Sequence, residues 1–252
     1  MENKLTPLRN IDSWAEPAKL GHPIIDGYLW RGEVSALVGA TGSGKSTRIA
    51  AEIWAVSNGV LTDDQGIVPA KIAVAAFKHG CIDARGMIEE VICSRPRTSR
   101  SKDSVIEIYE DGSVLDLVGS FAKQWSDDLK LFDALFIDDL SFLYSVTSSD
   151  EKSVAIECVM HLLAYMAREA NIAIRIAVPC FCPAVMNGGG VRGSADASAG
   201  AQNVDLIRVT DEGFELSPVK RSRHHPRDLT TSKWNVVKGP NGYPLLAARG
   251  SQ

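Results

Sequence analysis

The chain has 252 residues, 45% of them hydrophobic, and a formal net charge of −4 at pH 7. This length suits one large core, and the acidic balance excludes a global basic field that would draw the protein onto nucleic acid. The five cysteines are odd in number and lie mostly in apolar stretches, which favours reduced thiols in a cytoplasm over a disulfide framework. No apolar run approaches the roughly 18 residues that span a bilayer, so we expect no membrane segment.

The chain opens with residues 1–24, where prolines and tryptophans occur with little periodicity. They are predicted to form an N-terminal arm ahead of a core over residues 25–223. Residues 39–46 then spell the complete phosphate-binding pattern G-x-x-x-x-G-K-[ST], between an apolar strand over 34–38 and a helix over 48–55. The glycines let successive backbone N–H groups turn toward a phosphate, and the start of the helix adds its positive end.

This loop predicts binding of ATP or another nucleoside triphosphate together with Mg²⁺. Lys45 is expected to reach the outer phosphates, and the hydroxyl of Ser46 is expected to bind the magnesium ion. The residues predicted to bind the nucleotide are Gly39, Ala40, Thr41, Gly42, Ser43, Gly44, Lys45, Ser46 and Thr47.

Strands and helices alternate after the loop, which predicts an α/β fold with a mostly parallel sheet and helices on both faces. The expected strands are 71–77, 105–109, 134–138 and 172–178, and the expected helices are 82–93, 114–125 and 154–170. An antiparallel pair is expected over 206–209 and 214–219. Residues 224–252 are predicted to form a C-terminal hairpin and tail, because Asn241-Gly242 is a strong hairpin signal.

A second nucleotide motif is predicted where Leu135-Phe136-Ile137 ends in Asp138. An aspartate at the carboxyl end of a buried strand lies where open α/β sheets bind ligands, so Asp138 is expected to hold Mg²⁺ opposite Ser46. Hydrolysis also needs a group that orients the attacking water. Asp139 and Asp83 are the candidates for this base, and the sequence does not decide between them.

The segment from Ile25 to Val34, leading into the phosphate loop, resembles RecA-like ATPases of the DnaB, RadA and KaiC type. The chain is most similar to the small hexameric replicative helicases of the RepA type, found in plasmids and phages. This resemblance implies a homo-hexamer that hydrolyses ATP at subunit interfaces and acts on single-stranded nucleic acid, with DNA favoured over RNA and the choice left open. It also implies a place in the cytoplasm, which is that of the host if the protein is phage-encoded.

The resemblance also implies roles for two further segments. Arg192-Gly193-Ser194 is similar to the R-G-S that follows the mobile DNA-binding loop of these helicases, which implies nucleic-acid contacts by Asn187, Gly188, Gly189, Gly190 and Arg192. The segment from Val219 to Arg223 is similar to the K-x-R strand whose cations reach a neighbour's nucleotide site. Lys220 and Arg223 are therefore implied to act in catalysis across the subunit interface.

Two positions depart from the pattern of that family. Phe77-Lys78-His79 stands where a glutamate usually follows the second core strand, and Pro179-Cys180-Phe181-Cys182 stands where histidine or glutamine is common. Two other functions stay open: a hexameric RNA-packaging ATPase of the kind found in double-stranded-RNA phages, and a recombination or annealing protein with weak turnover.

Overall fold

The computed structural model describes residues 22–58, 70–76, 86, 90, 106–109, 131–138, 149–179, 200–211, 213–222, 231–238 and 244–248. The first half contains β1 (Pro23–Ile25), β2 (Leu29–Trp30), β3 (Val34–Gly39), α1 (Lys45–Asn58), β4 (Ile72–Ala76), β5 (Ile106–Tyr109) and β6 (Ala134–Asp138). The second half contains α6 (Ser149–Ala170), β7 (Ala173–Pro179), β8 (Asn203–Thr210), β9 (Gly213–Lys220), β10 (Ser232–Lys238) and β11 (Pro244–Ala248).

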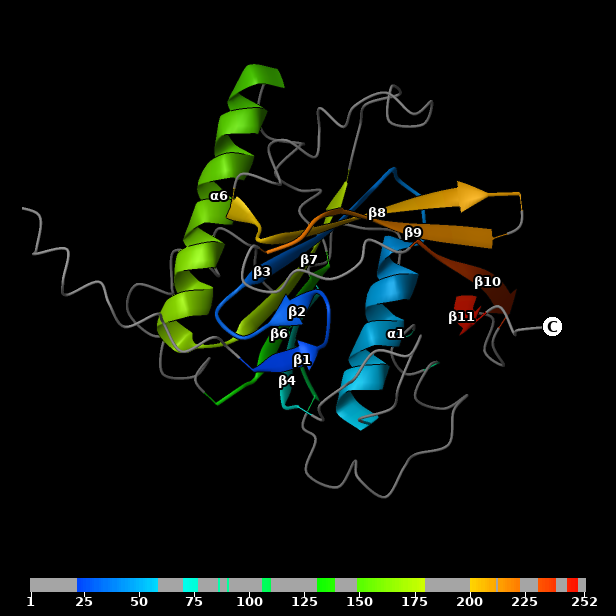
Figure 1. Cartoon of the computed structure of the whole chain (residues 1–252), viewed down its shortest axis with the longest axis horizontal. Helices are drawn as coiled ribbons and strands as arrows, with labels where there is room; N and C mark the ends of the chain where they lie inside the picture. The colour runs from blue at the N-terminus through cyan, green and yellow to red at the C-terminus, as the bar shows by residue number, and fades with distance from the viewer. Residues whose placement is uncertain are drawn as a thin grey trace, which may run out of the picture.

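Nine strands form one sheet in the order β11-β10-β9-β8-β3-β7-β6-β4-β5 (Figure 1). The pairings from β8 to β5 are all parallel, and those from β8 to β11 are all antiparallel. The predicted α/β class is therefore confirmed. The predicted antiparallel pair is β8 with β9, and the predicted C-terminal hairpin is β10 with β11, joined to the main sheet through β9.

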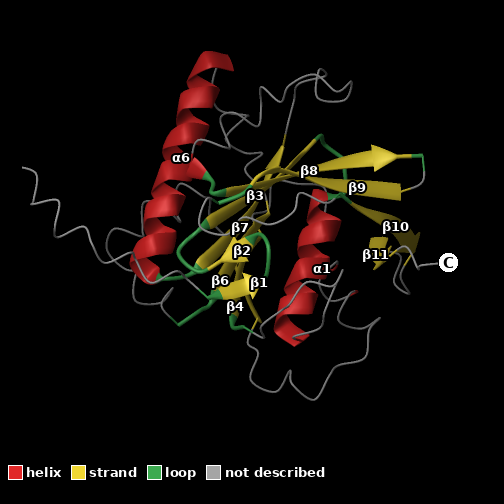
Figure 2. Cartoon of the chain, viewed as in Figure 1, coloured by secondary structure: helices red, strands yellow, loops and turns green. Residues whose placement is uncertain are grey.

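The central strands are buried on both faces because helices cover the sheet from two sides (Figure 2). Alternate residues of β3 enter different apolar clusters: Ala36 and Val38 face α6, whereas Leu37 faces α1. The short β1–β2 hairpin packs in the α1 cluster, where Ile24 and Leu29 are fully buried. None of the helices that the structure describes is both long and apolar enough to cross a membrane.

Of the helices that the structure describes, α1 and α6 are buried to different extents. α6 has a buried face with Leu163 and Ala167 and an exposed face that carries Arg168 and Glu169 beside Leu162 and Tyr165. α6 ends where Asn171 adopts a left-handed conformation, with φ of 53°. In contrast, every described side chain of α1 except Ser46 is buried, because β9, β10 and β11 curl around its outer side (Figure 1).

Candidate functional site

The predicted phosphate-binding loop, residues 39–46, called the phosphate loop below, lies between the carboxyl end of β3 and the first turn of α1. This is the edge at which open α/β sheets bind ligands. Gly42 and Gly44 have φ values of 76° and 86°, a left-handed conformation that residues with a Cβ atom rarely adopt. A Cβ atom at Gly44 would also lie 2.5 Å from the ring of Phe214 on β9. The loop therefore needs glycine at residue 44 for its backbone angle and for its contact with β9.

Lys45 is the first residue of α1 and is only 6% exposed. Its ammonium group donates to the carbonyl oxygens of Gly39, at 3.0 Å, and Ala40, at 2.9 Å. These carbonyls hold the ammonium beside the loop backbone. An incoming phosphate would offer the same cation a charged acceptor, and hydrogen bonds between charged groups are the stronger kind.

Ser46 and Asp138 come together although they are 92 residues apart. The strand that carries Asp138 is separated from β3 by β7, and the first turn of α1 reaches across this gap. The Ser46 hydroxyl donates to an Asp138 carboxylate oxygen at 3.1 Å. Two neighbouring ligands of an octahedral Mg²⁺, each about 2.1 Å from the ion, lie about 3 Å from one another. The spacing of these two oxygens therefore fits a shared magnesium ion.

Lys220 lies at the opposite edge of the sheet from the phosphate loop. It pairs with Val204 on β8, and the neighbouring Asn203 pairs with Ser35 at the start of β3. Gly39 is four residues beyond Ser35, about 13 Å along the strand at about 3.3 Å per residue. The Lys220 ammonium donates to the Ala201 carbonyl at 2.6 Å, and partial burial lowers the pKa of Lys220. Lys220 is thus directed away from the loop of its own chain.

The remaining predicted site residues lie outside the described part of the chain. They are the candidate bases Asp139 and Asp83, the candidate trans-acting Arg223, and the predicted nucleic-acid contacts Asn187, Gly188, Gly189, Gly190 and Arg192.

A buried ion cluster between α1 and the sheet was not predicted from the sequence. Its centre is Arg175 on β7, which is fully buried. The Arg175 guanidinium binds both carboxylate oxygens of Glu52 on α1, at 3.0 and 3.1 Å. It also donates to Ser35 at 2.6 Å and to Asp205 on β8 at 2.9 Å. One side chain therefore joins α1 to three neighbouring strands of the sheet.

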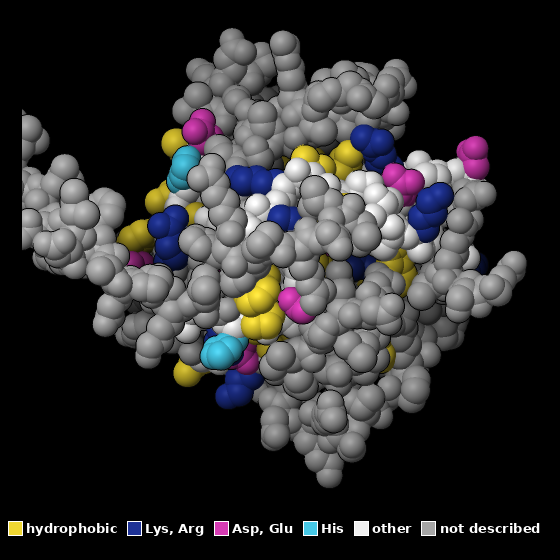
Figure 3. All heavy atoms as spheres, in the orientation of Figure 1, with side chains coloured by type: hydrophobic (Ala, Val, Ile, Leu, Met, Phe, Trp, Pro, Cys, Tyr) yellow, Lys and Arg dark blue, Asp and Glu magenta, His cyan; other side chains and the backbone are white. Residues whose placement is uncertain are grey.

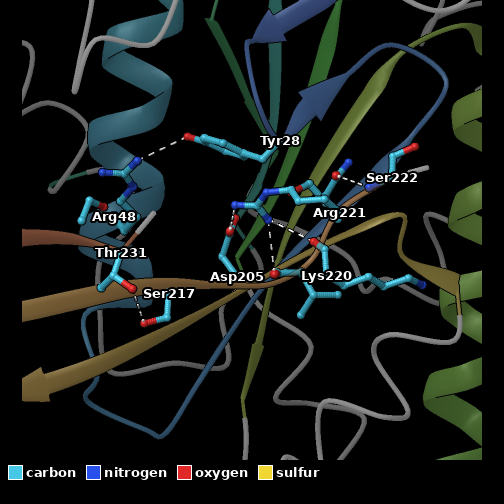
Figure 4. Close-up of polar contacts among 12 residues, drawn as sticks. Tyr28, Arg48, Asp205, Ser217, Lys220, Arg221, Ser222 and Thr231 are labelled. Carbon is cyan, nitrogen blue, oxygen red and sulfur yellow. Dashed lines mark hydrogen bonds and ion pairs between the residues drawn. The ribbon is translucent and has the colours of Figure 1, made fainter. Parts of the chain in front are cut away.

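Three further side chains complete this cluster. Arg48 donates to Glu52 at 2.8 Å and lies over the Trp234 ring, 4.7 Å from its centroid. The Tyr28 hydroxyl donates to Glu52 at 2.9 Å and is near Arg48, as Figure 4 shows. Arg221 donates to the second oxygen of Asp205 at 2.5 Å. We call Tyr28, Ser35, Arg48, Glu52, Arg175, Asp205 and Arg221 the Arg175 cluster.

Burial and charge act in opposite directions on the ionisable groups of this cluster. Burial by itself would raise the pKa of Glu52, but Arg175 and Arg48 together lower it below its usual range. Burial raises the pKa of Tyr28, so its hydroxyl keeps its proton and serves as a donor. Glu52 is therefore a carboxylate held by two guanidinium groups and one phenol. The sequence contained one signal of this arrangement, an arginine in the middle of the apolar run 172–178.

No protein-family model matches this sequence, and no curated protein shows significant similarity to it.

Proposed function

We propose that this protein is a Mg²⁺-dependent nucleoside triphosphatase with a RecA-like core. The observation that supports this most strongly is the contact between Ser46 and Asp138 at the edge of the sheet where the phosphate loop lies. The full sequence pattern, the two left-handed glycines and the buried lysine all occur at the same place. Ser46 and Asp138 are thus already placed side by side, at a spacing that suits two neighbouring Mg²⁺ ligands.

The residues of this chain would have the following roles. The N–H groups of the loop and the first turn of α1 would bind the phosphates, and Lys45 would pair with the outer phosphate oxygens. Ser46 and Asp138 would hold Mg²⁺, which supplies positive charge against the phosphates when bound. The base that orients water stays a prediction, with Asp139 and Asp83 as the candidates.

We further propose that the protein works as a ring, a homo-hexamer that moves along single-stranded nucleic acid. This part rests on the resemblance to RepA-type helicases. Since Lys220 is at the far edge of the sheet from its own phosphate loop, any role in hydrolysis requires the loop of a neighbouring subunit. The loop over 187–192 would contact the nucleic acid, by the same resemblance.

The test is the turnover of ATP by the purified chain and by Lys45→Ala, with and without single-stranded DNA or RNA. Lys45→Ala should abolish hydrolysis and leave the chain folded, with a lower melting temperature because Lys45 is buried and donates to two backbone carbonyls. Lys71→Ala is the matched control, since Lys71 is an exposed lysine ahead of β4. Hydrolysis that survives in Lys45→Ala would contradict the nucleotide assignment. Turnover that no nucleic acid stimulates would contradict the motor but leave the triphosphatase standing.

A further inference from the structure

We propose that the Arg175 cluster makes the end of β9 respond to the nucleotide bound in the same subunit, with Arg221 as the positioning residue. This inference rests on the proposed function, because it needs a nucleotide at the phosphate loop and a neighbour that uses the cations at the end of β9. It identifies the contacts by which a nucleotide bound in one subunit would influence the nucleotide site of the neighbouring subunit. Four observations carry it.

The first is the rigid attachment of the cluster to the phosphate loop. Arg48 and Glu52 lie on α1, which begins at Lys45 and runs without a break to Asn58. The Arg48 N–H binds the Gly44 carbonyl at 2.9 Å, so the helical hydrogen bonds start inside the loop itself. A displacement of the first turn of α1 is therefore also a displacement of Glu52.

The second is the chain of paired charges from α1 across the sheet. Glu52 binds Arg175 through two hydrogen bonds, and Arg175 binds one oxygen of Asp205. The other oxygen of Asp205 accepts from Arg221. Asp205 is fully buried, and the Arg221 side chain is 14% exposed, so little water is available to take the place of a lost partner. Each of these hydrogen bonds depends on the relative orientation of its two groups. A shift of Glu52 would therefore move Arg175 and change the geometry at Asp205.

The third is the position of Arg221, between Lys220 and Ser222 at the end of β9. Arg221 also donates to the backbone carbonyl of Lys220 at 3.1 Å, and Figure 4 shows it reaching toward Asp205. Ser222 is held separately: its N–H binds Asn203 at 3.0 Å and its hydroxyl binds Glu33 at 2.7 Å. The backbone beside Lys220 is thus fixed by the Arg175 cluster on one side, and on the other by polar contacts with Asn203 of β8 and with Glu33, the residue before β3.

The fourth is that a nucleotide must change the contacts of the first turn of α1. Lys45 now binds two carbonyl oxygens, and Ser46 now binds Asp138. Phosphate oxygens and Mg²⁺ would compete for these same groups. A ligand shifts a protein between two arrangements only through contacts that differ between them, and these contacts differ. The loss of the Lys45 contacts with the Gly39 and Ala40 carbonyls and of the Ser46–Asp138 hydrogen bond would be the change at the first turn of α1 that the cluster passes on.

The experiment is hydrogen exchange on mixed assemblies. Unlabelled wild-type chains are diluted into an excess of ¹⁵N-labelled Lys45→Ala chains, and a non-hydrolysable ATP analogue with Mg²⁺ is added at a concentration that saturates the wild type. The two kinds of chain differ in peptide mass, so their exchange is read separately. We expect the analogue to protect residues 40–48 of the wild-type chains, and to slow exchange at 217–222 of the same chains by about fivefold or more.

Arg221→Lys, placed in the unlabelled chain, tests the role of the cluster. It keeps the positive charge but loses the second nitrogen of the fork, so it should keep the protection at 40–48 and lose the response at 217–222. Arg168→Lys makes the same change on the exposed side of α6 and should respond like the wild type. If Arg221→Lys does not fold, Ser35→Ala, which removes one partner of Arg175, takes its place.

The outcomes separate this inference from the proposed function. Absence of protection at 40–48 in wild-type chains would overturn the nucleotide site itself. Protection at 40–48 without a response at 217–222, or with a response only in the labelled Lys45→Ala chains, would leave the nucleotide site standing and overturn the coupling within a subunit. An unchanged response in folded Arg221→Lys would overturn the role of the cluster.

Discussion

Of the helices that the structure describes, α1 and α6 are held to the sheet by different kinds of interaction. The described part of α6 meets the sheet through apolar side chains such as Met160 and Leu163, and its outer face mixes apolar and charged side chains, as the space-filling view shows (Figure 3). α1 is enclosed on all sides and carries the ion pair of Arg48 with Glu52 in its interior contacts. Apolar packing depends weakly on orientation, whereas guanidinium–carboxylate pairs fix it. The helix that begins at the phosphate loop is the one with fixed orientation.

The largest expected effect comes from removing the centre of the Arg175 cluster. Arg175→Met should lower the free energy of unfolding by about 3 to 5 kcal/mol, because it leaves Glu52 and Asp205 buried with fewer partners. Arg168→Met, on the exposed side of α6, should change it by less than about 0.5 kcal/mol. Urea unfolding of both variants measures this difference. Equal, small losses in both would mean that the cluster contributes no more than a surface charge.

Truncation of a core side chain of α6 should lower the stability of the fold without lowering the activity. Leu163→Ala should cost about 3 kcal/mol, because it leaves a cavity in an apolar cluster. Since α6 bears none of the residues proposed to bind phosphate, the proposed ATP turnover per folded molecule should stay at the wild-type level at a temperature where the variant is folded. A clear fall in turnover would show that α6 also positions the site, and the contrast between the two helices would not hold.

Acid should weaken the buried contacts that Glu52 makes on α1. The folded-state pKa of Glu52 lies below its unfolded value, so its contribution is fully present above about pH 4.5 and is lost as the pH falls through the folded-state pKa. Glu52→Gln lacks this titration. The stability gap between wild type and Glu52→Gln should therefore be widest near neutral pH and narrow below about pH 4.5. Urea unfolding across this range measures it, and a gap independent of pH would contradict the assignment of charge to Glu52.

Local patterns in the sequence predicted the parts of the molecule that depend on neighbouring residues. The phosphate loop follows from one continuous segment, and the α/β class follows from alternating strands and helices. The Arg175 cluster depends instead on strand order, which places residues 28, 52, 175 and 205 together from distant parts of the chain. In the sequence, Arg48 and Glu52 look like an ordinary i, i+4 pair on an exposed helix face. The pair is buried because Glu52 faces Tyr28 and Arg175 of the sheet, while Arg48 lies over Trp234 of β10.

The smallest effect should come from one hydroxyl group. Tyr28→Phe removes the donor to Glu52 but keeps the ring, which lies 4.6 Å from the Arg175 guanidinium. Glu52 retains Arg48 and Arg175 as partners. The free energy of unfolding should therefore fall by about 1 kcal/mol, the cost of one buried hydrogen bond. Tyr165→Phe is the matched control on α6, where the tyrosine is 58% exposed and the same change should have almost no effect. Thermal melts of the two variants, compared with the wild type, would detect this difference. A loss equal to that of Tyr165→Phe would mean that the phenol only fills space, and that two guanidinium groups alone hold Glu52 in place.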